Sequence, residues 1–491
     1  MGIIQRQALQ STIFGFLGSI FGGVMRLLTS IVISPAQIGL LNIIDFISGG
    51  FVIIFAMGYD QILIKLFPKY RDDENGHNGF LAFGIFLSLF GILLSSILFY
   101  FFGESIIKKD DLELFRRFSI LIFPLIFFRI IFYNLDGYVR MLYNTTIGVF
   151  LERFLSKVVI GACLILFGLA WISFDNLVYL YALAFCLPGI IIVVFSFYKT
   201  NKLVLPNPEI YQKSNRKKLY EYITFGLLMG ASGSIVVYID GFMITKMLSL
   251  EALGYYSIFF FAARFIIIPA QGIGRISMTI LAEAWEKNDR KTIADVYQKS
   301  CVNQLLIGAF LLGLGWTLLT PALELHLKLA DYAPHKIVFL ILGTGLVIEM
   351  ATGVNSVIIA ATEKYKFNTY FNIALAAVLI VLNYFFITAY DLIGAAVASA
   401  LGMTFINLLR WYFLVKNYQL QPFGKDFFKA LALSLTFVVG CYFLHYQGNP
   451  ILRILINTCV LTLLFWGIVV AFKLSPDVNT WLLKMKKKFY K

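Results

Sequence analysis

Apolar segments of about twenty residues recur along nearly the whole chain. Of its 491 residues, 59% are hydrophobic and 14% are charged, a balance that is too apolar for a soluble protein. A run of about 20 apolar residues crosses a hydrocarbon core of roughly 30 Å as a helix, and a helix satisfies its own backbone hydrogen bonds in lipid. The recurrence therefore predicts an all-α integral membrane protein.

Polar breaks between the apolar runs predict about fourteen transmembrane helices. Lysine and arginine gather in alternate loops, which favours a cytoplasmic location for both termini under the positive-inside rule. The net charge of +14 then reflects topology, so we expect no nucleic-acid partner. We expect spans near residues 9–34, 37–66, 79–103, 116–139, 147–171, 176–198, 219–247, 251–281, 301–321, 336–361, 367–390, 391–415, 427–446 and 451–473.

An internal repeat relates the two halves of the chain. The segment SPAQIGLL (34–41) matches SLEALGYY (249–256) at an offset of 215 residues, which pairs Gly39 with Gly254. Six predicted spans intervene, so the repeats run in the same direction, an arrangement found among secondary transporters. The repeat predicts two pseudo-symmetric six-helix lobes around a central cavity. The expected divisions are an N-lobe (1–198), a basic cytoplasmic linker (199–218), a C-lobe (219–416), two extra helices (417–473) and a basic cytoplasmic tail (474–491).

Ionisable residues inside the predicted spans are the clearest functional signal. Such groups face water or one another rather than lipid. One interpretation pairs Arg26 with Asp45, and Glu349 with Arg264 or Arg129, as ion pairs that hold the lobes together. The other places the arginines in a cavity, where their planar forks bind a phosphate or carboxylate. The candidate substrate-binding residues are Arg26, Arg129 and Arg264, and the candidate coupling or ion-pair residues are Asp45, Asp240 and Glu349.

Catalytic and metal-binding patterns are missing from the sequence. The predicted outer loops are short, no Gly-rich phosphate loop occurs, and the four histidines lie apart from one another in loops or at span ends. The five cysteines form neither a CxxC pair nor a cluster with histidine. We therefore expect no enzyme, no metal and no cofactor. Coupling of transport to a proton or sodium gradient is left open.

Three segments carry a resemblance to a known family. They are SPAQIGLLNIIDFISGG (34–50), VVYIDGFMITKMLSLEALGYYSIFFFAARF (236–265) and DLIGAAVASALG (391–402). The chain resembles the multidrug/oligosaccharidyl-lipid/polysaccharide (MOP) exporter superfamily over about residues 5 to 415, and most closely its polysaccharide flippase branch. The resemblance implies two six-helix lobes that enclose a cavity and alternate between inward-facing and outward-facing states.

The resemblance also implies a substrate class. Lipid II flippases of the superfamily carry arginines in spans 1, 2 and 8. Arg26 and Arg264 match spans 1 and 8, whereas span 2 offers Asp45. We expect a flippase that translocates an undecaprenyl-diphosphate-linked oligosaccharide across the bacterial inner (cytoplasmic) membrane, for O-antigen of lipopolysaccharide or another surface polysaccharide.

Several partners and alternatives follow from this expectation. The expected partners are the lipid-linked substrate, membrane lipids and other polysaccharide assembly proteins. A lipid II flippase and a multidrug/cation antiporter of the same superfamily are the alternatives. A polysaccharide polymerase is less favoured, because such enzymes usually carry a sizeable outer catalytic loop.

Overall fold

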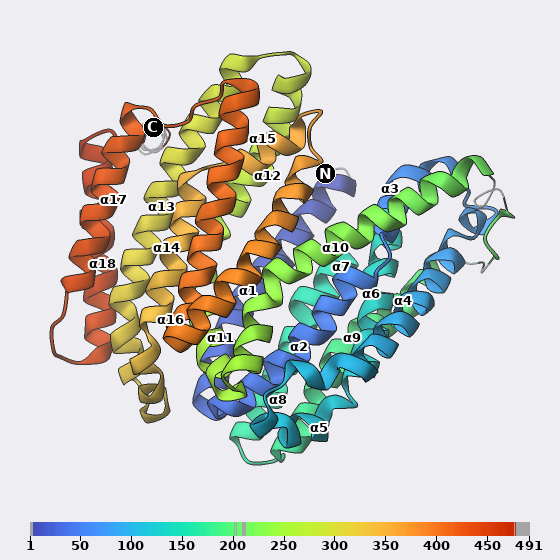
Figure 1. Ribbon diagram of the computed structural model, residues 1–491, viewed down its shortest axis with the longest axis horizontal. Coiled ribbons are helices and arrows are strands. Elements are labelled where there is room, and N and C mark those ends of the chain that lie inside the picture. The colour runs from blue at the N-terminus through green and yellow to red at the C-terminus, as the bar shows by residue number, and fades with distance from the viewer. Residues whose placement is uncertain (1–2, 201, 203, 209–212, 476, 478–491) are drawn as a thin grey trace. The chain divides into compact units, whose positions relative to one another are not determined.

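The chain is helical throughout the part that is described. The structure is a computed structural model that describes residues 3–200, 202, 204–208, 213–475 and 477. It is 86% helix, and the described residues contain no strand (Figure 1). The predicted all-α class is therefore confirmed. Parts of the expected linker (199–218) and most of the expected tail (474–491) lie outside the described residues.

The chain divides into two compact units, residues 1–254 and 255–491. The boundary falls inside α11 (Leu250–Arg264), so α10 groups with the first unit, whereas the repeat assigns residues 219–416 to one lobe. The repeat-based boundaries stay a prediction. The first unit contains α1 (Ile3–Val32), α2 (Pro35–Phe55), α3 (Tyr59–Tyr70), η1 (Gly76–Gly79), α4 (Phe80–Phe102), η2 (Gly103–Ile106), η3 (Lys109–Asp111), α5 (Leu112–Ser119), α6 (Ile122–Met141), α7 (Thr146–Val149), the π-helical η4 (Phe150–Leu155), α8 (Ser156–Gly168), α9 (Phe174–Thr200) and α10 (Lys213–Met247). The second unit contains α12 (Ile268–Glu286), α13 (Arg290–Glu324), η6 (Leu327–His335), α14 (Ile337–Ala351), α15 (Asn355–Ala361), α16 (Phe367–Tyr418), α17 (Lys425–Phe443) and α18 (Pro450–Ala471).

Nine helical segments of the described chain are long and apolar enough to cross a membrane, or up to eleven if each bent pair is one span. The predicted count of fourteen is not confirmed. One of the nine, α16, has 52 residues and would measure about 78 Å, more than twice the thickness of a hydrocarbon core. Its backbone leaves the helical region at Tyr390 and Asp391. This break coincides with the predicted boundary between the spans 367–390 and 391–415.

The second predicted span contains a break that the sequence did not indicate. Its first helix, α2, begins with a capping box in which Ser34 and Gln37 exchange hydrogen bonds, and Pro35 occupies its first turn, a favourable helix start. After Phe55 the backbone takes positive φ angles at Met57 and Gly58. Helix α3 then continues, so α2 and α3 together form one candidate span.

The two repeat motifs contact each other directly within the first unit. A Cβ on Gly39 would lie 1.8 Å from the carbonyl oxygen of Leu250, and a Cβ on Gly254 would lie 1.9 Å from that of Pro35. Pro35 and Leu250 are themselves equivalent positions of the repeat. The contact is therefore reciprocal, and its closeness requires glycine at both positions. Asp111 also accepts a hydrogen bond of 2.8 Å from the Leu250 amide.

The two helices that follow the repeat pack within the second unit. Helices α17 and α18 lie against α13 (Figure 1). The ring of Phe465 lies 5.5 Å from that of Phe310 and 4.6 Å from that of Phe437, measured between centroids. All three side chains belong to one buried apolar cluster. Burial of such aromatic surface fixes α17 and α18 to α13.

Candidate functional site

Helix α2 carries a polar stripe that organises the candidate site. Asn42, Asp45 and Ser48 are spaced by three residues along an otherwise apolar helix, so they share one side of it. Asn42 and Ser48 are fully buried, whereas the Asp45 side chain is 19% exposed. The Ser48 hydroxyl donates to the carbonyl of Ile44 at 2.9 Å, which anchors that side chain to its own helix. Buried polar groups need such partners, and the stripe meets them on neighbouring helices.

Arg129 of α6 contacts this stripe with one nitrogen. Its Nη1 donates to Asp45 Oδ1 at 2.8 Å, to Ser48 Oγ at 2.6 Å and to the Asp45 carbonyl at 3.3 Å. The two charged side chains are 22% and 19% exposed. The guanidinium carbon also lies 4.8 Å from the ring centroid of Phe185 on α9. Three helices, α2, α6 and α9, therefore fix the position of Arg129.

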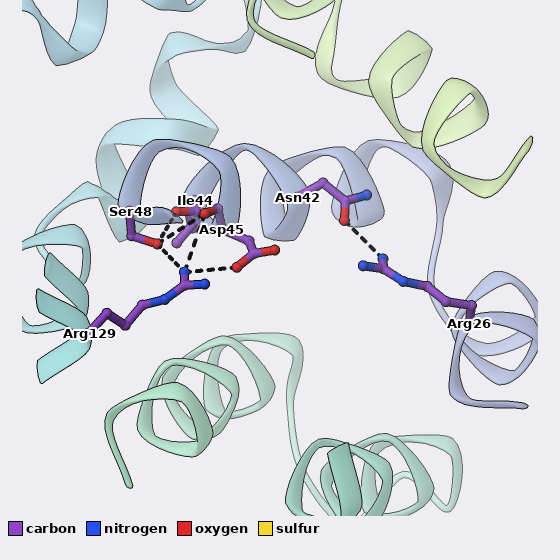
Figure 2. A network of polar contacts seen from close by, with 6 residues as sticks. All are labelled: Arg26, Asn42, Ile44, Asp45, Ser48 and Arg129. Carbon is purple, nitrogen blue, oxygen red and sulfur yellow. Dashed lines mark hydrogen bonds and ion pairs between the residues drawn. The ribbon is translucent and has the colours of Figure 1, made fainter. Parts of the chain in front are cut away.

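Arg26 of α1 approaches the same face of α2, nearer to the start of that helix (Figure 2). Its Nη1 donates to Asn42 Oδ1 at 2.9 Å. Figure 2 shows the two arginines converging on one face of α2, with Asp45 between them. The sequence suggested Arg26 as the partner of Asp45. The structure gives Asp45 an ion pair with Arg129, because α6 brings that arginine to α2.

A lysine completes the cluster and was not among the charges expected from the sequence. Lys157 of α8 interacts electrostatically with Arg26, Asp45 and Arg129, and also with the exposed Glu152 of η4. Its ammonium nitrogen lies 5.5 Å from the ring centroid of Phe185, so Phe185 contacts two cations. Its position well inside the predicted span 147–171 was the available signal. We call Arg26, Arg129, Lys157 and Asp45 the α2 charge cluster.

Two tyrosines border the α2 charge cluster. Tyr181 of α9 packs its ring edge-to-face against that of Phe185, with 5.0 Å between the centroids. Tyr238 of α10 packs 5.3 Å from Phe46, and its hydroxyl lies 2.8 Å from the position of a Cβ on Gly49. Both phenols interact electrostatically with Arg129. The cluster therefore combines cations with phenolic hydroxyls, which are suitable donors to phosphate or sugar oxygens.

The remaining candidate in the first unit is Asp240. It lies on α10, two positions after Tyr238, and is only 7% exposed. Its burial confirms that it points into protein rather than lipid. Its coupling role stays a prediction.

The second unit contains a separate charged group around Glu349. This carboxylate of α14 interacts electrostatically with Arg410 of α16 and with Arg264 of α11. Arg410 donates to Asn372 Oδ1 at 3.2 Å and was not among the residues expected from the sequence. Arg264 is exposed, with its guanidinium carbon 5.5 Å from the Phe260 ring centroid. We call Glu349, Arg264, Arg410 and Asn372 the α14 charge group.

A neutral polar network lies beside the α14 charge group, where α14 breaks before α15. The Asn407 Oδ1 accepts hydrogen bonds from Thr352 Oγ1 at 2.9 Å and from Asn355 Nδ2 at 3.0 Å. Thr352 follows Glu349 by three residues, and the Glu349 carbonyl oxygen, 2.8 Å away, shares the hydroxyl proton of Thr352 with Asn407 Oδ1. The network therefore satisfies the backbone at the break between α14 and α15.

Metal chemistry has no candidate group in the part of the chain that the structure describes. There, no three histidine, cysteine, aspartate or glutamate side chains come together as metal ligands. Two clusters of charge among apolar helices are what the structure offers. Such placement marks a pathway or binding site for a charged or polar solute.

Comparison with known proteins places the chain in a family. The family model described as "Polysaccharide biosynthesis protein" matches residues 4–281. An uncharacterized membrane protein of Methanocaldococcus jannaschii, MJ1068, is 22% identical over 475 residues, which cover 92% of this chain and 90% of that protein.

Solved structures of MOP superfamily transporters share the fold. The lipid II flippase MurJ, in an inward closed conformation, is 18% identical with a TM-score of 0.72, covering 94% of this chain and 99% of that one. A multidrug resistance MATE family transporter in an inward-facing conformation is 13% identical with a TM-score of 0.64, covering 83% and 97%. A MOP superfamily transporter from Pyrococcus furiosus is 13% identical with a TM-score of 0.56, covering 84% of this chain and 95% of that one. The binding pocket of that transporter is described as having reverse polarity. The chain therefore belongs to the polysaccharide biosynthesis protein family, and it is a multi-pass membrane protein with the fold of the MOP superfamily transporters.

Proposed function

We propose that this protein translocates an undecaprenyl-diphosphate-linked oligosaccharide, a repeating unit of O-antigen or another surface polysaccharide, across a bacterial cytoplasmic membrane. It works by alternating access, loads from the cytoplasmic leaflet and has both termini in the cytoplasm. The observation that carries the proposal is the α2 charge cluster, where three cations surround one carboxylate. Membership of a polysaccharide biosynthesis family supports the glycan part of the substrate.

The energetic problem is the passage of a charged, hydroxyl-rich head group through about 30 Å of hydrocarbon. Cations held inside the bundle replace water around a diphosphate, and arginine forks donate two hydrogen bonds at once to phosphate oxygens. Arg26 and Arg129 supply these forks in the first unit, and Arg264 is a further candidate phosphate-binding arginine in the second unit. Tyr181 and Tyr238 offer hydroxyl groups to the glycan. No bond is made or broken, so the protein is not an enzyme.

The cationic surplus also separates this proposal from its rivals. A carrier of cationic drugs requires negative charge at its binding site, and the α2 charge cluster is positive overall. A lipid II flippase stays the second candidate, because MurJ shares the fold and lipid II carries the same diphosphate chemistry. The two flippase activities differ in the glycan rather than in the phosphates.

The proposal is tested by reconstitution of the purified protein into liposomes that contain a fluorescent undecaprenyl-diphosphate oligosaccharide. The readout is the fraction of glycan that an external glycosidase can cleave. We expect translocation by the wild type and its loss in the Arg26→Ala and Arg129→Ala variants. Arg116→Ala is the matched control, since this exposed arginine pairs with Glu104 away from the cluster. Wild-type translocation by both cluster variants contradicts the proposed site, and a lack of translocation by the wild type contradicts the function.

The glycan is identified by a parallel experiment in cells. A deletion strain should accumulate the lipid-linked oligosaccharide on the cytoplasmic side, and its mass gives the repeating unit. Accumulation of lipid II instead would favour the second candidate. Export of a cationic dye by the reconstituted protein would favour the drug antiporter.

A further inference from the structure

We propose that Asp45 is an internal counter-anion, which occupies the α2 charge cluster when no ligand is bound and gives up Arg129 to a ligand phosphate. This inference rests on the proposed function, because it describes how the same cluster takes and releases its anion. Lys157 acts in it as the third ligand-binding cation. Asp45 thereby sets how tightly the site holds a diphosphate.

The geometry of Arg129 leaves most of its donors available. All of its hydrogen bonds to described residues leave from Nη1. An arginine that binds a carboxylate through two nitrogens forms the stronger, forked pair. The pair with Asp45 is single, so Nε and Nη2 are not committed to a described acceptor. A phosphate that bound through them would replace one contact with two.

Arg129 also keeps its place when Asp45 leaves. Its bonds to Ser48 Oγ, at 2.6 Å, and to the Asp45 carbonyl do not involve the carboxylate. Ser48 is held in turn by the Ile44 carbonyl, and the Phe185 ring supports the guanidinium. Rotation of the Asp45 side chain alone therefore makes the Arg129 guanidinium accessible to a ligand, and α6 does not have to move. The 19% exposure of that side chain leaves it room to rotate.

The charge balance gives the exchange its direction. Asp45 provides one negative charge among Arg26, Arg129 and Lys157, and the exposed Glu152 adds a second beside Lys157, so the cations stay in excess. A diphosphate brings at least two charges, so it neutralises the cluster more fully than Asp45 does. When the ligand departs, Asp45 returns to Arg129 and reduces the repulsion among the cations. After a multiply charged anion has left, the Asp45 carboxylate therefore supplies a negative charge to the three cations.

The experiment measures binding of inorganic diphosphate to the purified full-length protein in lipid nanodiscs by calorimetry. If the site is about 90% occupied by Asp45 in the resting protein, Asp45→Asn should lower the apparent Kd about tenfold. Asp45→Glu keeps the charge and should leave the Kd close to that of the wild type. Lys157→Gln should raise the Kd about tenfold, since one of three cations is lost.

Asp60→Asn is the matched control for Asp45→Asn. Asp60 also pairs with an arginine of α6, Arg140, at 3.3 Å, but outside the α2 charge cluster. We expect its Kd to equal that of the wild type. The elution volume and the thermal unfolding of each variant show whether it is folded.

The outcomes separate this inference from the proposed function. If the wild type binds diphosphate and Asp45→Asn binds it equally or more weakly, the exchange is wrong and the proposed function stands. If the wild type does not bind diphosphate, both fail. Tighter binding in Asp45→Asn together with slower translocation in liposomes supports release by exchange, because the ligand then leaves without a returning counter-anion.

Discussion

The α2 charge cluster and the α14 charge group differ in how the carboxylate contacts the neighbouring cations. Each brings a carboxylate close to more than one cation among apolar helices. In the first, Arg129 meets Asp45 at 2.8 Å. In the second, the described residues show no ion pair for Glu349, and Arg410 donates to the amide of Asn372 instead. In a direct ion pair, the arginine depends on a single carboxylate for its hydrogen bond. In the α14 charge group, Arg410 bonds to a neutral amide, and Glu349 acts on Arg410 and Arg264 only through electrostatic attraction.

The difference assigns distinct roles to the two regions. A direct, single hydrogen-bonded pair can be exchanged for a ligand, as proposed for Asp45. The neutral network around Asn407 is already satisfied among Thr352, Asn355 and backbone carbonyls. We therefore propose that Glu349 balances charge at the α14 break and that the α2 charge cluster is the ligand-binding region. Substitutions in the two regions should therefore differ in how much they lower the free energy of unfolding and in whether they change the Kd for diphosphate.

The largest effect is expected for Arg129→Ala. Removal of one partner of a partly buried ion pair leaves Asp45 without its direct contact, which costs about 3 kcal/mol of unfolding free energy, the lower end of the usual range, because Lys157 and Arg26 remain near. Titration of unfolding in mixed micelles measures this loss. The double variant Asp45→Ala with Arg129→Ala should recover most of the stability. Equal instability of the single and double variants would show that Arg129 does not act through Asp45.

Arg410→Ala should have a smaller effect, and it is the counterpart in the second unit. It removes the hydrogen bond to Asn372 but breaks no direct ion pair, so we expect a loss of about 1–2 kcal/mol in the same unfolding titration. Binding of diphosphate should not change. A destabilisation as large as that of Arg129→Ala would erase the contrast between the two regions.

The smallest effect is expected for Ser48→Ala. The Ser48 hydroxyl positions Arg129, and its loss leaves the ion pair in place, so we expect a loss of about 1 kcal/mol in the same titration. The apparent Kd for diphosphate should rise by a few fold, because the arginine is held less firmly. Unchanged affinity in a variant that is as stable as the wild type would remove Ser48 from the account.

The sequence predicted the fold class and several elements well. The repeat identified Gly39 and Gly254 as equivalent, and the break at Tyr390 falls where two spans were expected to meet. The sequence could not show that the two glycines pack against each other's motif, because a repeat reports equivalence rather than contact. The breaks after α2 and α14 were also missed, although each contains a glycine with a positive φ angle, Gly58 and Gly353.

The charged residues show the same limit. Arg26, Arg129 and Asp45 were recognised because charges inside apolar spans are rare. The sequence did not predict which of these residues form the ion pair, because depth along a helix does not show how neighbouring helices are rotated or placed. Lys157 and Arg410 also lie inside predicted spans but were not singled out, and a long basic side chain in a span can snorkel to the interface. Sequence alone does not separate such residues from those that turn inward.

The most direct test of the central claim compares the wild type's affinity for two lipids that differ only in charge. Undecaprenyl diphosphate and neutral undecaprenol are titrated into the protein in nanodiscs, with Arg26→Ala and Lys157→Gln as companions. Three surrounding cations predict at least a hundredfold preference for the diphosphate in the wild type and a reduced preference in each variant. Equal affinity of the wild type for the two lipids would contradict the claim that the α2 charge cluster binds the anionic head group.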